Sequence, residues 1–429
     1  MYCERSFFRP FAVFLLLAVA ALSPLSPQAS AAEPLTLEFV VNAWHQAVID
    51  SIQSAVSRFE RLHPGLRVYV HARSGSWNDV VVRVAAGVPP DVVTTGVFTA
   101  GEWYENGVII PLDPFVSDAL REQIFEPMWH NFTWQGHVLA VPAIESGPRQ
   151  GMVWNRDMLD AAGLALDPDR PMTWRQFFDY SDKLTVVDAE GRVSRIGFDP
   201  RNGQNSRLFT MAPLWNASIF ATATGRPQLN HPNFVGMIDL ITDRVFRRHP
   251  DFKGSTAWYA IAETKSVAVT ALGSYGPGEI RTRDPEMRIV VGWGPHDQGT
   301  RVQQTLGWGL AIPNGAPHPE ESFALINFLA TDLAFNTELF ERTGFFGGSK
   351  ALFSQLAREV SDESVRWYIQ SVLQADLIDA PSPDRFIGRA NALFADAVNR
   401  VYRLEDAAET ALAEANRLLV AEMREEGRL

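Results

Sequence analysis

Apolar residues near the start of the chain recur first at every second position and then at helical spacing. They alternate with more polar neighbours over 35–41, which is the period of a β-strand, and return every three or four positions over 48–62, as in an amphipathic helix. The same reading predicts a strand over 66–70, a short helix over 79–86 and a strand over 91–94. Strands alternating with helices predict a mostly parallel sheet covered by helices.

A second set of similar patterns follows. Gly136 lies between two short apolar runs and predicts a hairpin, after which a strand through 152–154 leads into a helix from Arg156. Thr173 is followed three residues later by Gln176, which predicts a capping box at the start of another helix. This restart of strand and helix predicts a second α/β lobe.

The last part of the chain mixes strands with a helical tail. Strand-like segments occur at 266–271, 289–293 and 310–312. From Pro319 onward the spacing is almost entirely helical, and one long final helix is predicted over 390–424.

The first residues have the pattern of a secretory signal peptide. Two arginines precede an apolar run over 11–22, and small residues follow, so residues 1–31 are expected to be removed near Ala31. The run is shorter than the about 20 residues that span a bilayer. The only cysteine, Cys3, lies ahead of the run and so is not expected to carry a lipid anchor. Export to the periplasm is the expected location.

Composition narrows the expected partners. The net charge is −12 and no block of lysine and arginine occurs, so neither nucleic acid nor an anionic membrane surface is an expected partner. The chain has 12 Trp and 27 Phe residues. Such side chains build either the core or flat stacking surfaces for a ligand, and composition leaves both open.

Several segments, in this order, resemble family 1 extracellular solute-binding proteins of ABC transporters, the group that includes maltose- and glycerol-phosphate-binding proteins. The chain departs from the family pattern at Trp154, where tyrosine is usual, and at Tyr275, where tryptophan is usual, and both changes keep an aromatic ring. The segments that carry the resemblance are 87–93 (GVPPDVV), 107–113 (GVIIPLD), 136–142 (GHVLAVP), 154–157 (WNRD), 173–174 (TW) and 266–275 (SVAVTALGSY).

The resemblance implies an α/β periplasmic-binding-protein fold with two lobes, an interlobe cleft and hinge crossovers. Residues 33–142 plus 264–312 are expected to form the first lobe, and 143–263 plus 313–429 the second. It also implies two membrane permease subunits and a cytoplasmic ATPase as transport partners. A monomer without a cofactor is expected.

Candidate ligand contacts come from the loops that follow strands, because ligands of parallel α/β sheets bind at the carboxyl ends of the strands. Trp44 and His45 follow the first strand, and Thr94 and Thr95 follow the third. Glu145, after the hairpin, is a possible acceptor for sugar hydroxyls. For each, an ordinary loop residue is the alternative.

Three aromatic residues and one arginine complete the candidates. Tyr275 follows a strand in a glycine-rich loop and is expected to stack on the ligand from the first lobe while contributing little to folding. Trp308 lies between two glycines, and Trp215 falls in a predicted helix where it could equally be core. Arg342 could contact an anionic group or satisfy carbonyl groups at a helix end.

No catalytic signature stands out in the sequence. The motifs H-E-x-x-H, G-x-S-x-G and G-x-x-x-x-G-K-[ST] are missing, and the histidines show no metal-binding spacing. The favoured interpretation is a binding protein, not an enzyme, that captures a sugar, oligosaccharide or polyol by hinge closure and has no metal site. An exported carbohydrate-active hydrolase is the alternative, and it would need two suitably spaced carboxylates. A scaffold without a ligand is a third interpretation.

Overall fold

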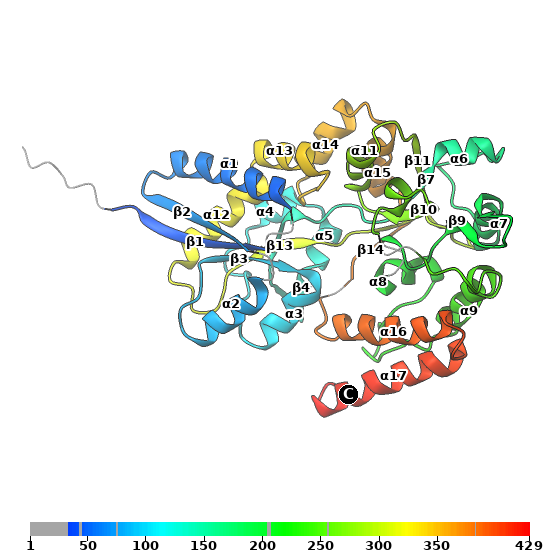
Figure 1. Ribbon diagram of the computed structural model, residues 1–429. Helices are drawn as coiled ribbons and strands as arrows, with labels where there is room; N and C mark the ends of the chain where they lie inside the picture. The colour runs from blue at the N-terminus through cyan, green and yellow to red at the C-terminus, as the bar shows by residue number, and fades with distance from the viewer. Residues whose placement is uncertain (1–32, 43–44, 74–75, 204–206, 255–256, 382) are drawn as a thin grey trace, which may run out of the picture.

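The computed structural model describes residues 33–42, 45–73, 76–203, 207–254, 257–381 and 383–429. They form two α/β lobes side by side, each with its own sheet (Figure 1). Within these ranges no helix is both long enough and apolar enough to cross a membrane.

The first lobe is built on a five-stranded sheet with the order β2-β1-β3-β13-β6. Strands β1, β2 and β3 are parallel, whereas β13 runs antiparallel to both β3 and β6. The strands are β1 (Leu35–Asn42), β2 (Leu66–Arg73), β3 (Val92–Gly96), β6 (Val141–Glu145) and β13 (Trp308–Ala311).

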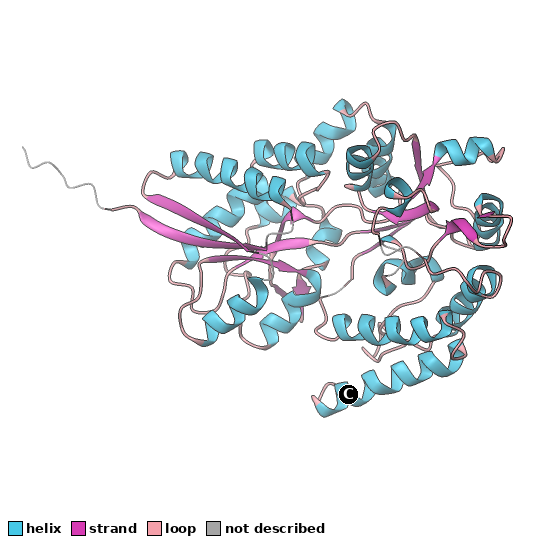
Figure 2. Ribbon diagram, viewed as in Figure 1, coloured by secondary structure: helices cyan, strands magenta, loops and turns pink. Residues whose placement is uncertain are grey.

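Helices cover both faces of this sheet (Figure 2). The apolar stripe of α1 predicted from the sequence is buried, with Ile52 and Phe59 fully inside the core. The helices of this lobe are α1 (Gln46–Leu62), α2 (Ser76–Ala85), α3 (Val97–Glu105), α4 (Asp118–Gln123), α5 (Glu126–His130), α12 (Pro319–Thr331), α13 (Leu333–Thr343) and α14 (Lys350–Glu359). The predicted hairpin is present as β4 (Thr133–Trp134) and β5 (His137–Val138).

The second lobe is built on a sheet with the order β11-β7-β10-β9-β8. The capping box is confirmed. The backbone N–H of Gln176 donates to Thr173 Oγ1 at 3.2 Å, and the backbone N–H of Thr173 donates to Gln176 Oε1 at 2.9 Å. The strands are β7 (Gly151–Asn155), β8 (Val186–Val187), β9 (Val193–Phe198), β10 (Val267–Leu272) and β11 (Ile289–Gly292).

The helices around the second sheet complete this lobe. They are α6 (Arg156–Ala161), α7 (Trp174–Leu184), α8 (Leu208–Met211), a 3₁₀ turn (Ala212–Trp215), α9 (Pro232–Ile241), a π-helical turn (Thr242–Phe246), α10 (Ala260–Glu263), α11 (Gly276–Arg283), α15 (Glu363–Gln374), α16 (Ile387–Tyr402) and α17 (Ala408–Glu425).

The chain passes between the lobes at 146–150 and at 293–307, and returns to the second lobe after α14. At these crossings β12 (Val302–Gln304) pairs in parallel with β14 (Leu377–Asp379). Gln303 and Gln304 are fully buried there, and Gln304 Nε2 donates to Asp379 Oδ2 at 2.6 Å. The crossings are therefore tied together by a small sheet and buried amides.

The lobe boundaries differ from those expected in two places. Residues 264–312 were assigned to the first lobe, but β10 and β11 both pair with β7 in the second sheet, and only β13 joins the first. Conversely, α12 to α14, expected in the second lobe, bury their apolar side chains in the first-lobe core. Apolar periodicity identifies a strand or helix but does not encode which sheet it joins.

The predicted single final helix is also wrong. It is interrupted after Tyr402, where Leu404 adopts a left-handed backbone conformation with φ 61°. The interruption lets α16 and α17 fold back on each other and bury Ala397 and Leu412 in one core.

Candidate functional site

A buried ion pair occupies the middle of the interface between the lobes. Glu145 ends β6, and Arg149 lies in the first crossing, with Nη1 3.0 Å from Glu145 Oε1 and Nη2 donating to Oε2 at 3.2 Å. Their side chains are 5% and 13% exposed. Burial raises the pKa of Glu145, and the Arg149 charge opposes that rise. Arg149 Nε also donates to the Leu306 carbonyl oxygen in the second crossing at 3.2 Å.

Trp308 lies on the first-lobe side of this pair and packs against a further tryptophan, Trp77. Trp308 is the register partner of Glu145 in the first sheet, and its indole N–H hydrogen-bonds to the Glu145 carboxylate. The Trp77 ring meets the Trp308 ring edge-on with centroids 5.0 Å apart, and it meets Trp103 at 5.9 Å. The sequence analysis named Glu145 and Trp308, and the structure brings them together.

Tyr275 connects the two lobes. It immediately precedes α11 of the second lobe, yet its ring lies 5.5 Å from the Arg149 guanidinium carbon and 5.9 Å from Phe345 of the first-lobe core. Only 7% of the residue is exposed. The expectation of an exposed ring on a first-lobe loop with little role in folding is therefore corrected, because the ring fills space between the lobes.

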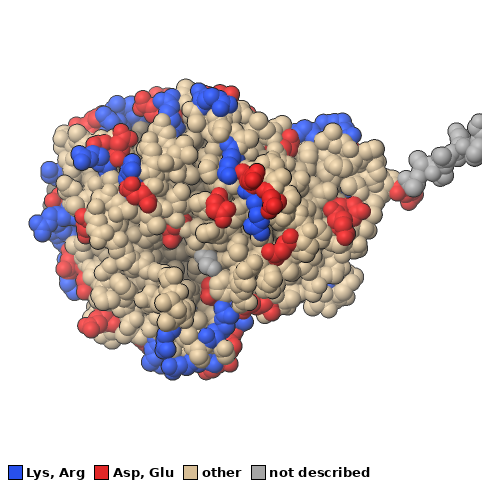
Figure 3. All heavy atoms as spheres, turned by 180° about the vertical axis from the view of Figure 1, so that it is seen from behind, with Lys and Arg blue, Asp and Glu red and all other residues tan. Residues whose placement is uncertain are grey.

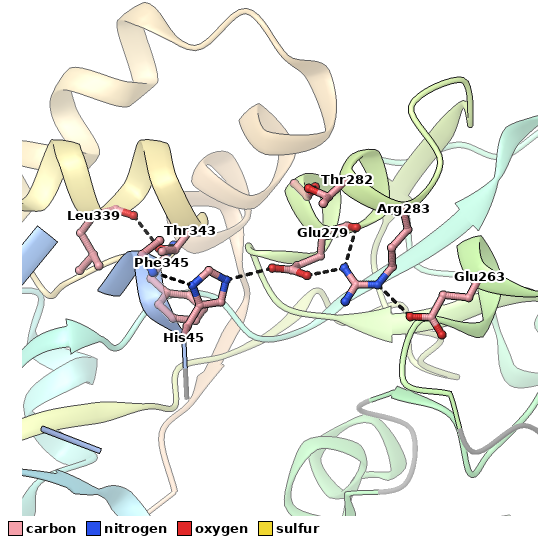
Figure 4. Close-up of polar contacts among 10 residues, drawn as sticks. His45, Glu263, Glu279, Thr282, Arg283, Leu339, Thr343 and Phe345 are labelled. Atoms are coloured by element: carbon pink, nitrogen blue, oxygen red, sulfur yellow. Dashed lines mark hydrogen bonds and ion pairs between the residues drawn. The ribbon is translucent and has the colours of Figure 1, made fainter. Parts of the chain in front are cut away.

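His45 contacts the second lobe directly (Figure 4). Its Nε2 lies 3.3 Å from Glu279 Oε1 on α11, while its Nδ1 accepts the Ala47 N–H at 3.3 Å and so caps α1. With Nδ1 accepting, the hydrogen of the neutral ring is on Nε2 and is donated to Glu279. Arg283 hydrogen-bonds to Glu279 and donates to Glu263 Oε1 at 2.8 Å. These residues form the α1–α11 contact. Trp44 lies outside the described residues.

A second interlobe contact joins α3 to the helices of the second lobe. The Phe98 and Phe209 rings lie 4.4 Å apart, although one belongs to α3 and the other to α8. At the end of α3, Glu105 Oε2 lies 3.2 Å from Arg385, and Glu105 Oε1 lies 3.5 Å from Arg428 after α17. We call this the α3–α8 contact. The sequence carries no local signal for it, because its partners are far apart in the chain.

Thr94 and Thr95 are buried near the end of β3, and their hydroxyl groups hydrogen-bond within the first lobe. Thr94 Oγ1 accepts the Asn42 N–H at 2.9 Å, and Thr95 Oγ1 lies 3.1 Å from Thr99 Oγ1. Their exposed fractions are 2% and 0%. Both side chains therefore stabilise the backbone near the end of β3, close to the candidate site.

Trp215 and Arg342 do not join the cluster. Trp215 is buried in the second-lobe core, with its ring 6.0 Å from Phe234, which is the core alternative that the sequence left open for it. Arg342 is half exposed on α13 and pairs with Glu338 at 3.2 Å on the first-lobe surface. The sequence allowed Arg342 to contact either an anionic group or the carbonyl groups at a helix end. In the structure its side chain forms ion pairs on the surface.

A hollow is visible between the lobes on the face opposite to that of Figure 1 (Figure 3). Acidic and basic side chains both occur around it, so neither sign of charge dominates this face. Two lobes joined by hinge crossings, with aromatic and polar side chains at their interface, define a two-lobed binding protein.

Residues 43–333 match the family described as bacterial extracellular solute-binding protein, and the chain belongs to that family. The resemblance found in the sequence and the expected two-lobed α/β fold are confirmed. One relative, named an uncharacterized lipoprotein in the oleD 5′ region of Streptomyces antibioticus, is 28% identical over 331 residues, which cover 74% of this chain and 71% of the relative.

Solved structures share the fold. CpMnBP1 with mannotriose bound has a TM-score of 0.77 at 20% identity, covering 90% of this chain and 100% of that chain. The ABC substrate-binding protein Lmo0181 from Listeria monocytogenes, in complex with cycloalternan, has a TM-score of 0.75 at 15% identity, covering 91% and 99%.

Proposed function

We propose that this protein is the periplasmic substrate-binding subunit of an ABC importer and that its ligand is an uncharged carbohydrate. The observation that carries the proposal is the cluster at the middle of the interface, where Trp308, packed on Trp77, lies beside the buried Glu145–Arg149 pair. Sugars are bound by flat aromatic faces and by fixed polar groups in a site that excludes water.

The polar part of the cluster suits hydroxyl groups better than a charged ligand. Glu145 and Arg149 neutralise each other, so the pair offers hydrogen-bond acceptors and donors without a free charge. A phosphate or carboxylate ligand would favour an unpaired arginine or lysine. The carbohydrates named with the solved structures of the same fold, mannotriose and cycloalternan, are in keeping with this chemistry.

We expect the ligand to be captured when the two lobes close around it. A ligand that contacts both lobes interacts more strongly with the closed form and so raises its population. In this proposal the lobes rotate about the crossings that the small sheet of β12 and β14 joins. The closed form is then recognised by the permease subunits. No bond of the ligand is broken, and the family match gives the hydrolase alternative no support. Export by a cleaved signal peptide and a monomeric state belong to the same proposal.

A thermal-shift screen of the mature protein against sugars, oligosaccharides and polyols tests this function. A ligand at about 100 times its dissociation constant should stabilise the native state by about 2.7 kcal/mol. Trp308→Ala should reduce that shift, whereas Phe115→Ala, at a ring that packs on Phe323 within the first lobe, should not. Failure of every carbohydrate to raise the melting temperature contradicts the proposal, as does hydrolysis of a ligand that does bind.

A further inference from the structure

We propose that the second lobe contains an accessory binding site for a small uncharged molecule that is mainly apolar and carries a hydrogen-bond acceptor such as a carbonyl oxygen. The site is a cavity of about 250 Å³ between α8, the 3₁₀ turn after it, α9 and α16 (Figure 1). Within the part of the chain that the structure describes, Glu145, Arg149 and Trp308 do not line this cavity. Its occupant would therefore be bound apart from the cluster at the middle of the interface.

The wall of the cavity is largely apolar. Five buried side chains from α8, α9 and α16 contribute to it, namely Leu208, Met211, Ile238, Phe394 and Val398. An apolar cavity of about 150 Å³ is large enough to bind benzene. The larger cavity of this protein therefore has room for one substituted aromatic ring, and burial of such a ring against apolar side chains favours binding.

The cavity has an open side at α16. Ala395 and Asn399 lie one turn apart on this helix, and both line the cavity. Ala395 is partly exposed and Asn399 is exposed. A small molecule can therefore reach the apolar wall from solvent along this side of the helix.

One buried hydroxyl group of the wall has no hydrogen-bond partner. Tyr402 lines the cavity and is 8% exposed, and its hydroxyl makes no hydrogen bond within the described residues. Its ring is held by stacking on Phe246, with ring centroids 4.4 Å apart. A buried hydroxyl group without a partner is costly, so an occupant that offers an acceptor oxygen gains a hydrogen bond here.

The charge in the wall is already compensated. Arg201 is the one charged residue that lines the cavity among the residues described, and its Nε donates to Asp199 Oδ1 at 3.3 Å. The Asp199 side chain has no exposed surface. An anion entering the cavity would lose its hydration and find this arginine already paired, so an uncharged occupant is expected.

Two probes of the same shape test the chemistry of the site. Acetophenone carries a carbonyl oxygen where α-methylstyrene carries a methylene group. In calorimetric titrations of the mature protein, acetophenone should bind to one saturable site at least about threefold more tightly than α-methylstyrene, because only the ketone accepts a hydrogen bond from Tyr402. An apolar cavity without a usable donor would prefer the hydrocarbon.

Variants of the wall add a second readout. Tyr402→Phe removes the hydroxyl and keeps the stacked ring, so it should abolish the preference for acetophenone and leave the affinity for α-methylstyrene unchanged. Ala395→Phe and, from α8, Leu208→Phe should each fill the cavity and weaken acetophenone binding at least about tenfold. Ala392→Phe is the matched control, since Ala392 is an exposed residue of the same helix that does not line the cavity. Melting temperatures show whether each variant is folded.

Three results would overturn the proposal. The first is that acetophenone shows no saturable binding to the wild type. The second is that α-methylstyrene binds more tightly than acetophenone, because the hydroxyl of Tyr402 would then not contact the occupant. The third is that both filling variants fold and bind acetophenone as the wild type does, because the probe would then lie outside this cavity.

Discussion

The middle of the interlobe interface and its ends use the same kind of interaction in different surroundings. The Glu145–Arg149 side chains are 5% and 13% exposed, whereas those of His45 and Glu279 are 34% and 22% exposed. Breaking a buried pair leaves an uncompensated charge shielded from solvent, whereas the partners of an exposed pair can each be solvated by water and ions. The middle therefore holds the crossings in place, and the polar end can open at little cost.

This difference suits a protein that must open and close in each transport cycle. Contacts that form on closure need to be individually weak, because otherwise the closed form would dominate without ligand. The α1–α11 contact meets that requirement through its exposure. The middle of the interface instead joins the two crossings, since Arg149 in the first crossing donates to the Leu306 carbonyl oxygen in the second.

The largest effect is expected from breaking the buried pair. Glu145→Gln leaves Arg149 charged and without its counterion, and should lower the free energy of unfolding by about 3 kcal/mol. Urea denaturation measures the loss. The double variant Glu145→Gln with Arg149→Met removes both charges and should recover most of the stability. Equal stability of the single variant and the wild type would show that the pair is solvated.

Tyr275→Ala should have the next largest effect. The ring is nearly buried between Arg149 and Phe345, so its removal leaves a cavity that should cost about 3 kcal/mol. Tyr275→Phe keeps the ring and should lose less than a third of that amount. The measurement is the melting temperature of the ligand-free protein. If Tyr275→Ala does not lower it, the ring is not part of the interlobe packing.

A much smaller effect is expected at the exposed end. Glu279→Gln should change the free energy of unfolding by less than about 1 kcal/mol, since both partners of His45–Glu279 are partly solvated. A double-mutant cycle with His45→Gln isolates the coupling between the two side chains. A coupling as large as that of the buried pair would contradict the contrast between the middle and the ends.

The smallest effect concerns an exposed pair beside the hinge sheet. Arg301 hydrogen bonds hold the pKa of Asp376 at about 2, below its usual 3.8. A carboxylate with a lowered pKa stabilises the native state above its unfolded pKa, and this contribution disappears as the pH falls through the folded value. Asp376→Asn should therefore flatten the stability profile between about pH 4 and pH 2. Profiles of variant and wild type that coincide would mean that the pair does not affect folding.

Local patterns in the sequence predicted most elements correctly. The buried stripe of α1 was visible as a helical period, and the capping box of Thr173 as a pair of residue types three positions apart. The ordered family segments predicted the two-lobed fold. Glu145 was named because it comes after the predicted hairpin, and Trp308 because it lies between two glycines. In the structure they end β6 and begin β13 of the first sheet.

The sequence alone determined the succession of strands and helices, the fold class and two residues at the centre of the site, because these depend on neighbours a few positions apart. Only the tertiary structure decided that β10 joins the second sheet, that Tyr275 is buried, and that Glu279 meets His45 although 234 positions separate them. Such contacts form when distant segments pack together. Local spacing carries no record of which side chain will lie opposite which.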